Sequence, residues 1–133
     1  MYLEGPMGLN MDLSQSKLSI STWEWGPYLG EEARKSGIHM MVSSFTRFHP
    51  NINMTKSKIT GNYANSMMVK TLALRFGYDE AVILDSSGYV AECTGENLFM
   101  VRNGVLITSP RALILEDITR DTVMKIAADL DIQ

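Results

Sequence analysis

The chain has 133 residues and a formal net charge of −3, with 45% hydrophobic and 20% charged residues. This length suits one domain with a modest core, and the charge balance offers no basic excess for nucleic acid. The single cysteine, Cys93, excludes an intrachain disulfide framework, and no apolar run reaches the roughly 20 residues that cross a bilayer, so we expect a cytoplasmic protein without membrane or nucleic-acid partners.

The first part of the chain predicts strands and one short helix, followed by a polar connector. Alternating polarity indicates strands, and Gly37 is a typical residue to end a helix. In chain order we expect a loop or strand end over 1–10, a strand over 17–25, a helix over 29–37, a strand over 38–45, and a polar connector over 46–58.

A longer helix is predicted directly after the connector. Over 63–76 the apolar residues follow helical spacing, and Gly77 ends the pattern. Asn62 or Asn65 is the candidate cap residue at the start of this helix.

The remainder of the chain predicts short strands and a final helix. Asn103-Gly104 between two apolar runs is a strong hairpin signal. The strand-like runs are 80–85, 89–93, 97–102 and 105–109. The last segment, 118–133, predicts a helix whose apolar face is made by Val123, Ile126, Ala127 and Leu130.

The order of these elements predicts the fold class. Strands come in consecutive groups rather than alternating strictly with helices, which favours an α+β fold over a doubly wound sheet. The loop-like start and the closing "LDIQ", a natural lead-in to another strand, indicate the middle of a larger protein.

Four segments in order carry a resemblance that covers nearly the whole chain. They are "WGPYLG" (25–30), "SKITGNYANS" (57–66), "GYVAECTGENLFMVRNGVLITSP" (88–110) and "ILEDITRDTVMKIA" (114–127). Together they resemble the branched-chain amino acid aminotransferases of the pyridoxal-phosphate fold type IV group. The resemblance implies a mixed, mainly antiparallel sheet in a barrel-like arrangement with flanking helices, like the large domain of D-amino acid aminotransferase. It also implies pyridoxal 5'-phosphate as cofactor, and amino transfer between leucine, isoleucine or valine and 2-oxoglutarate.

Three polar residues match the family residues that surround the cofactor ring. Lys58 matches the lysine that forms an imine and then carries a proton, a role for which burial and the cofactor would favour the neutral amine. Tyr63 matches the tyrosine that hydrogen-bonds the phenolic oxygen, and Glu92 the carboxylate that pairs with the pyridine nitrogen. Glu96 is a rival for the latter role, and Lys56 is interpreted as a solvated connector lysine.

The segment before the last helix matches the part of the family site that holds the ring and the phosphate. Leu115 matches an apolar residue packed against the ring, and the start of a helix at Ile118 and Thr119 matches a phosphate cup. The family usually has glycine where this chain has Asp117. A carboxylate beside a phosphate dianion would repel it unless the side chain turned away to cap the helix.

The resemblance also implies substrate contacts and a larger assembly. Trp25 and Tyr28 match aromatic residues of the family's substrate pocket, and no residue pattern suggests a metal site. We expect residues 1–28 to be an interdomain segment with the first strand of the large domain, and 29–133 to be a partial cofactor-binding domain. The family's N-terminal domain and C-terminal end would be absent, and the full-length form would be a homodimer or higher homo-oligomer.

Two alternatives remain open at this stage. A D-amino acid aminotransferase or an aminodeoxychorismate lyase would reuse the lysine and the glutamate, although the GNY after Lys58 and the pair Trp25 and Tyr28 count against both. A catalytically silent fragment or assembly partner is the other interpretation, and Asp117 favours it.

Overall fold

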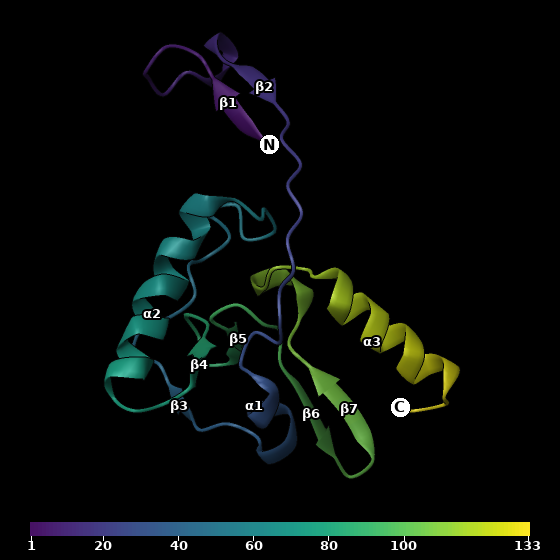
Figure 1. Cartoon of the computed structure of the whole chain (residues 1–133). Coiled ribbons are helices and arrows are strands. Elements are labelled where there is room, and N and C mark those ends of the chain that lie inside the picture. The colour runs from purple at the N-terminus through teal and green to yellow at the C-terminus, as the bar shows by residue number, and fades with distance from the viewer.

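The computed structural model describes all 133 residues and has an α+β architecture, as the sequence predicts (Figure 1). The strands are β1 (Tyr2–Glu4), β2 (Gln15–Lys17), β3 (Met40–Val42), β4 (Glu80–Leu84), β5 (Val90–Cys93), β6 (Phe99–Arg102) and β7 (Val105–Thr108). The α-helices are α1 (Glu31–Ser36), α2 (Tyr63–Arg75) and α3 (Ile118–Asp129).

The central layer is α2 packed against a three-stranded sheet in the order β3-β4-β5 (Figure 1). Val69 and Ala73, four residues apart on α2, meet Ala81 and Ile83, two residues apart on β4. The helical and strand periods each bring one residue pair to the shared face, and all four side chains are buried. Met41 of β3 packs on the edge of this small core. The connector between β3 and α2 is therefore anchored at both of its ends.

The strand pairings are mixed and mainly antiparallel, as expected. β3 pairs with β4 in parallel, whereas β1 with β2, β4 with β5, and β6 with β7 are antiparallel. In the β4–β5 pairing Glu92 lies opposite Ile83. The β6–β7 hairpin turns at Asn103 and Gly104, which have φ of 52° and 79°, so the predicted hairpin is confirmed and uses the left-handed backbone that favours these residues.

The expected barrel-like arrangement is not formed within this chain. The strands make separate sheets of two, three and two strands, and the sheets do not join into one another. A barrel requires a continuous hydrogen-bonded ring of strands, and the largest sheet here has three.

The strand predicted over 17–25 is also wrong. Only Lys17 belongs to a strand, β2, and residues 18–27 run without regular structure from the β1–β2 hairpin to the body of the molecule (Figure 1). The segment has alternating polarity but no neighbouring strand to accept its backbone hydrogen bonds, and alternation alone cannot supply one.

The predicted helices form, but the apolar face of α3 is only partly covered. Gly37 ends α1 with φ of 80°, and α2 ends just before Gly77. On α3, Ala127 is buried while Ile126 and Leu130 remain 52% and 65% exposed. None of the helices is long and apolar enough to pass through a membrane.

Candidate functional site

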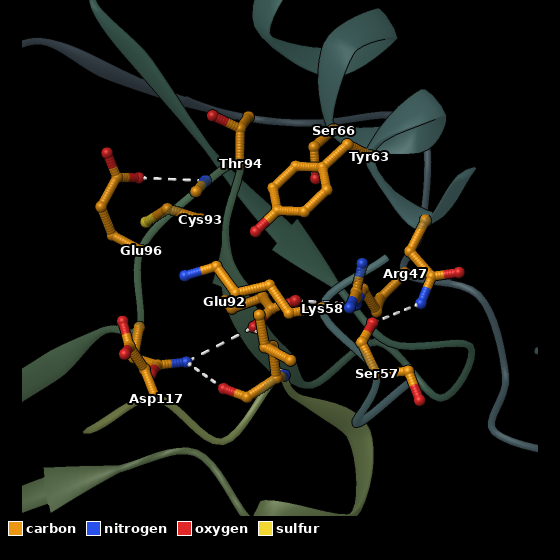
Figure 2. Close-up of a pocket in the computed structure, with 14 residues that line it drawn as sticks. Arg47, Ser57, Lys58, Tyr63, Ser66, Glu92, Cys93, Thr94, Glu96 and Asp117 are labelled. Carbon is orange, nitrogen blue, oxygen red and sulfur yellow. Dashed lines mark hydrogen bonds and ion pairs between the residues drawn. The ribbon is translucent and has the colours of Figure 1, made fainter. Parts of the chain in front are cut away.

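The main pocket opens where the connector before α2, the start of α2, the end of β5 and the segment before α3 meet (Figure 2). Polar side chains dominate its lining. The pocket brings together four of the residues that the sequence singles out as cofactor contacts, namely Lys58, Tyr63, Glu92 and Leu115. These residues lie up to 57 positions apart in sequence, so only the fold assembles them.

Glu92 is the buried acid of this pocket, and three groups hold it. One carboxylate oxygen, Oε1, lies 2.7 Å from the Nε of Arg47, and both side chains are more than nine-tenths buried. The other oxygen, Oε2, accepts hydrogen bonds from the backbone N–H of Leu115 at 3.1 Å and from the Nδ2 of Asn97 at 3.4 Å. Asn97 also donates to the carbonyl of Leu115 at 3.1 Å, which ties the segment before α3 to β5.

The electrostatic setting of Glu92 favours a further cationic partner. Burial raises the pKa of Glu92 above its ordinary value, although the Arg47 charge and the Leu115 N–H act in the opposite direction. The Nε of Arg47 is close enough for an ion pair but is not aligned as a hydrogen-bond donor to any group. A cationic N–H placed in the pocket would therefore stabilise the ionised carboxylate further.

Lys58 reaches the pocket from the connector, and Figure 2 shows its side chain and the Tyr63 hydroxyl pointing into the same space beside Glu92. Lys58 is exposed and forms no ion pair, so the burial expected for it is not supplied by this chain. Tyr63 is half-buried at the first position of α2. Lys56, two residues before Lys58, pairs with Glu116 at 2.7 Å, which agrees with its interpretation as a surface lysine.

Asn62 holds the connector that carries Lys58. It is buried, and its Nδ2 donates to the carbonyls of Met54 and Ser57, both at 2.8 Å, while its Oδ1 accepts from Asn53 at 2.7 Å. Asn62 occupies the N-cap position of α2, as predicted, but its side chain makes no cap hydrogen bond. The buried amide is used instead to satisfy backbone groups of the loop, as buried polar groups require.

Replacing Asn62 with alanine should therefore loosen the Lys58 connector. We expect the free energy of unfolding to fall by about 1–3 kcal/mol, because two carbonyls and one amide lose their partner. Denaturant unfolding measures this difference. Asn65→Ala is the matched control, since Asn65 makes a single 3.2 Å bond to the Thr46 carbonyl. Equal losses in the two variants would contradict the role given to Asn62.

A second acidic cluster borders the same pocket. Glu80 is buried and pairs with the Nζ of Lys70 at 2.8 Å, and it accepts the N–H of Ala81 at 2.7 Å. Burial acts to raise the pKa of Glu80, but these hydrogen bonds outweigh it and hold the pKa below its ordinary value. Glu96, which lines the pocket, accepts only the N–H of Gly95 at 3.2 Å, and its Oε1 is buried without a partner. Glu96 thus has no cation like the one beside Glu92.

The Glu96 environment predicts a pH-dependent stability. Burial raises the pKa of Glu96 above the ordinary 4.5, and the nearby Glu80 carboxylate adds to the shift. The folded state then holds the Glu96 proton to higher pH than the unfolded state does. Stability therefore falls as pH rises from the ordinary carboxyl pKa to the raised one. We expect Glu96→Gln to be more stable than the parent at pH 7, and the gain to vanish below the ordinary carboxyl range.

Unfolding curves across pH measure this gain. Glu116→Gln is the control of opposite sign, because the Lys56 hydrogen bond lowers the pKa of Glu116, so its ionised form favours folding above the ordinary value. A Glu96→Gln gain that persists unchanged in acid would contradict the account.

The residues expected to hold a phosphate lie beside the main pocket rather than in it. Ile118 and Thr119 begin α3 and are both exposed. Ile118 lines an adjoining hollow together with Arg111 and Arg120. Asp117 lines both hollows, and its side chain does not cap α3. The alternative in which Asp117 turns away to cap the helix is therefore wrong.

The two aromatic residues expected at the substrate pocket do not line it. Trp25 is 70% exposed, and its ring is tilted by 30° against that of Trp23, with centroids 5.9 Å apart. Tyr28 comes nearer: its ring lies 5.3 Å from the Nζ of Lys70, and its hydroxyl faces Gly95 on the pocket rim. The structure does not bring Trp25 to the site.

Three residues shape the pocket in ways that the sequence did not predict, Arg47, Asn62 and Asn97. No local pattern marks Arg47, because its partner Glu92 lies 45 positions away. Asn62 lies in the segment 57–66 and Asn97 in the segment 88–110. An asparagine next to a turn was the only local sign that either side chain could bond to loop backbone. No group of three or more histidine, cysteine, aspartate or glutamate side chains is arranged to hold a metal ion.

Comparison with known proteins identifies relatives of this chain both in sequence and in structure. A curated branched-chain-amino-acid aminotransferase from Pseudomonas aeruginosa is 46% identical over 123 residues, which cover 92% of this chain and 40% of that protein. The chain thus spans about two fifths of the length of this relative. The solved branched-chain amino acid aminotransferase of Escherichia coli matches with a TM-score of 0.81 and 47% identity, over 84% of this chain and 37% of that one.

A second solved relative is in a cofactor-bound form. The branched-chain amino acid aminotransferase from Thermobaculum terrenum in its PLP form matches with a TM-score of 0.68 and 41% identity, over 70% of this chain and 31% of that one. The family model for amino-transferase class IV matches residues 5–133. The chain therefore belongs to the class IV aminotransferase family.

Proposed function

We propose that this chain carries the ring-binding part of a pyridoxal-phosphate site that transfers amino groups between branched-chain L-amino acids and 2-oxoglutarate. The observation that supports it most is that Lys58, Tyr63 and Glu92, from three separate segments, line one pocket. Relatives named as branched-chain amino acid aminotransferases, one of them solved in its PLP form, support the reaction and the cofactor.

The donor set of the pocket fits such a cofactor ring. An amine, a phenol and a buried carboxylate with a raised pKa suit an aldehyde, a phenolic oxygen and a ring N–H respectively. Leu115 would lie against the ring, and the first N–H groups of α3, at Ile118 and Thr119, would face the phosphate.

The side chains of this site have separable tasks. When bound, pyridoxal phosphate supplies an aldehyde that amines attack and a ring that takes up electrons. The Nζ of Lys58 would hold that aldehyde covalently in the absence of substrate, and with substrate bound it would take up the proton from the substrate Cα. Glu92 in its ionised form would stabilise a protonated ring nitrogen, and Arg47 holds Glu92 in place. The Tyr63 hydroxyl would donate to the phenolic oxygen.

The rest of the whole protein is part of this proposal. We infer that residues 29–133 belong to a barrel-like large domain and 1–28 to the interdomain segment, with the N-terminal domain and the C-terminal end supplied by further chain. Trp25 and Tyr28 would reach the substrate only in that assembly, since here Trp25 is exposed and Tyr28 lies at the rim. A homodimer or higher homo-oligomer in the cytoplasm completes the proposal.

Activity of the protein that contains this chain tests the substrate class. With 2-oxoglutarate as acceptor, we expect L-leucine to be deaminated and D-alanine to be inert. Turnover of D-alanine alone would favour a D-amino acid aminotransferase, and release of pyruvate from an aminodeoxychorismate-type substrate would favour the lyase. Failure of the 133-residue chain to take up pyridoxal phosphate at Lys58 would favour the catalytically silent alternative.

A further inference from the structure

Asp117 is an unpartnered acid at the entrance of the proposed phosphate position. It immediately precedes α3 in extended backbone, with φ of −95° and ψ of 147°, and it is half-buried. Its side chain makes no cap hydrogen bond and no ion pair, and it lines both the main pocket and the adjoining hollow. Figure 2 shows Asp117 across the pocket from the Tyr63 ring.

The neighbouring acids, by contrast, are neutralised. Glu116 pairs with Lys56 at 2.7 Å, and Asp121 pairs with Lys125 at 2.7 Å. Arg120 also lines the adjoining hollow, but its guanidinium donates to the carbonyl of Ser109 at 3.1 Å instead of pairing with Asp117. Arg111 lines the hollow as well, and Asp117 is the acid of this group that forms no ion pair.

The same place carries the positive end of α3. The first N–H groups of a helix have no intrahelical partner and attract one anion. In α3 the first backbone bond runs from the Asp121 N–H to the Asp117 carbonyl, so the N–H groups of residues 118–120 are free to face an anion. Asp117 lines the same hollow as Ile118 and Arg120, so its negative charge repels an anion that approaches these groups.

We propose that Asp117 makes this site discriminate against a phosphorylated ring ligand relative to its unphosphorylated counterpart. The inference rests on the proposed function, because it concerns the phosphate end of the same pocket. Asp117 would weaken the binding of the phosphate dianion, and the matched ligand without that group is a pyridine aldehyde with a hydroxymethyl group in its place, such as pyridoxal. A unit negative charge and a phosphate dianion that share a partly solvated site repel enough to change affinity by about tenfold or more.

Parallel titrations of the 133-residue chain test this. Dissociation constants for pyridoxal phosphate and for pyridoxal are measured by absorbance with the parent, Asp117→Asn, Asp117→Gly and Asp117→Glu. Asp117→Asn keeps the size and removes the charge, whereas Asp117→Glu keeps the charge and is the matched control. We expect Asp117→Asn and Asp117→Gly to bind pyridoxal phosphate at least about tenfold more tightly, with pyridoxal changed less than about twofold.

The comparison is made as the ratio of the two dissociation constants, so the different reactivity of the two free aldehydes cancels between variants. Asp117→Glu should keep the parental ratio, and added salt should reduce the difference between parent and Asp117→Asn because it screens the charges. Unfolding curves of each variant show that the folded chain is being compared.

Each other outcome is decisive. A ratio that Asp117→Asn leaves unchanged overturns the inference, and so does a ratio that changes in Asp117→Gly but not in Asp117→Asn, since size rather than charge would then be responsible. In both cases borohydride reduction still attaches the ligand to Lys58, and the proposed function stands. If reduction attaches neither ligand to Lys58 in any variant, the proposed function fails and this inference with it.

Discussion

Lys58→Ala is expected to abolish the reducible attachment of pyridoxal phosphate to the chain, while Lys56→Ala leaves it intact. The two lysines are two residues apart on one exposed connector, so generic reactivity would label both. They differ in place: Lys58 lines the pocket with Tyr63 and Glu92, whereas Lys56 is paired with Glu116 at 2.7 Å. Mass mapping after borohydride reduction counts the label on each residue.

The same substitution should remove activity from the protein that contains this chain. A positioned group that attacks the cofactor and moves a proton contributes about 10²–10⁴-fold to the rate, so Lys58→Ala should lose at least that factor. Equal labelling of Lys56 and Lys58 in the parent chain, or a Lys58→Ala variant that remains active, would show that the pocket does not select Lys58.

Arg47→Met should be the most destabilising change in the site. It removes the cation 2.7 Å from the Glu92 carboxylate and leaves that buried acid unpaired, at a cost of about 3–5 kcal/mol in the free energy of unfolding. Adding Glu92→Gln should recover most of the loss, because glutamine still accepts from Leu115 and carries no charge. Denaturant unfolding of both single variants and the double variant measures the coupling.

The loss in Arg47→Met should also depend on pH. Burial already raises the pKa of Glu92, and the Arg47 charge opposes that rise, so removing Arg47 raises the folded pKa further. The folded state then releases its proton at higher pH than the unfolded state does, and stability falls as pH rises through the ordinary 4.5 to the raised value. The cost should be largest at neutral pH and small in acid. A cost that does not vary with pH would mean that Arg47 acts through packing alone.

Local patterns predicted the elements that depend on local physics. The helical spacing of 63–76 and the Gly77 stop predicted α2, and Asn103-Gly104 predicted the β6–β7 hairpin, because these signals lie within a few residues. The strand predicted over 17–25 does not form, because a strand depends on contacts outside its own segment. Its alternation is local, but a strand needs a partner, and none lies beside this segment.

The site, too, could be predicted only in part. The family resemblance predicted that Lys58, Tyr63 and Glu92 share one site, and in the structure all three line the main pocket. Contacts between distant segments could not be predicted from single positions: the Arg47–Glu92 ion pair spans 45 residues, and Leu115 donates to a carboxylate 23 residues earlier. The burial expected of Lys58 was also wrong, since its connector lies on the surface.

The central claim is that Lys58 and Glu92 face one ring from two sides. The most direct test is the ¹⁵N chemical shift of the ring nitrogen in the borohydride-reduced ligand on Lys58, followed across pH in the parent chain and in Glu92→Gln. We predict that the nitrogen stays protonated to higher pH in the parent, because only an ionised carboxylate beside it stabilises the charged form. Superimposable titrations in the two proteins would place the carboxyl away from the ring and contradict the account.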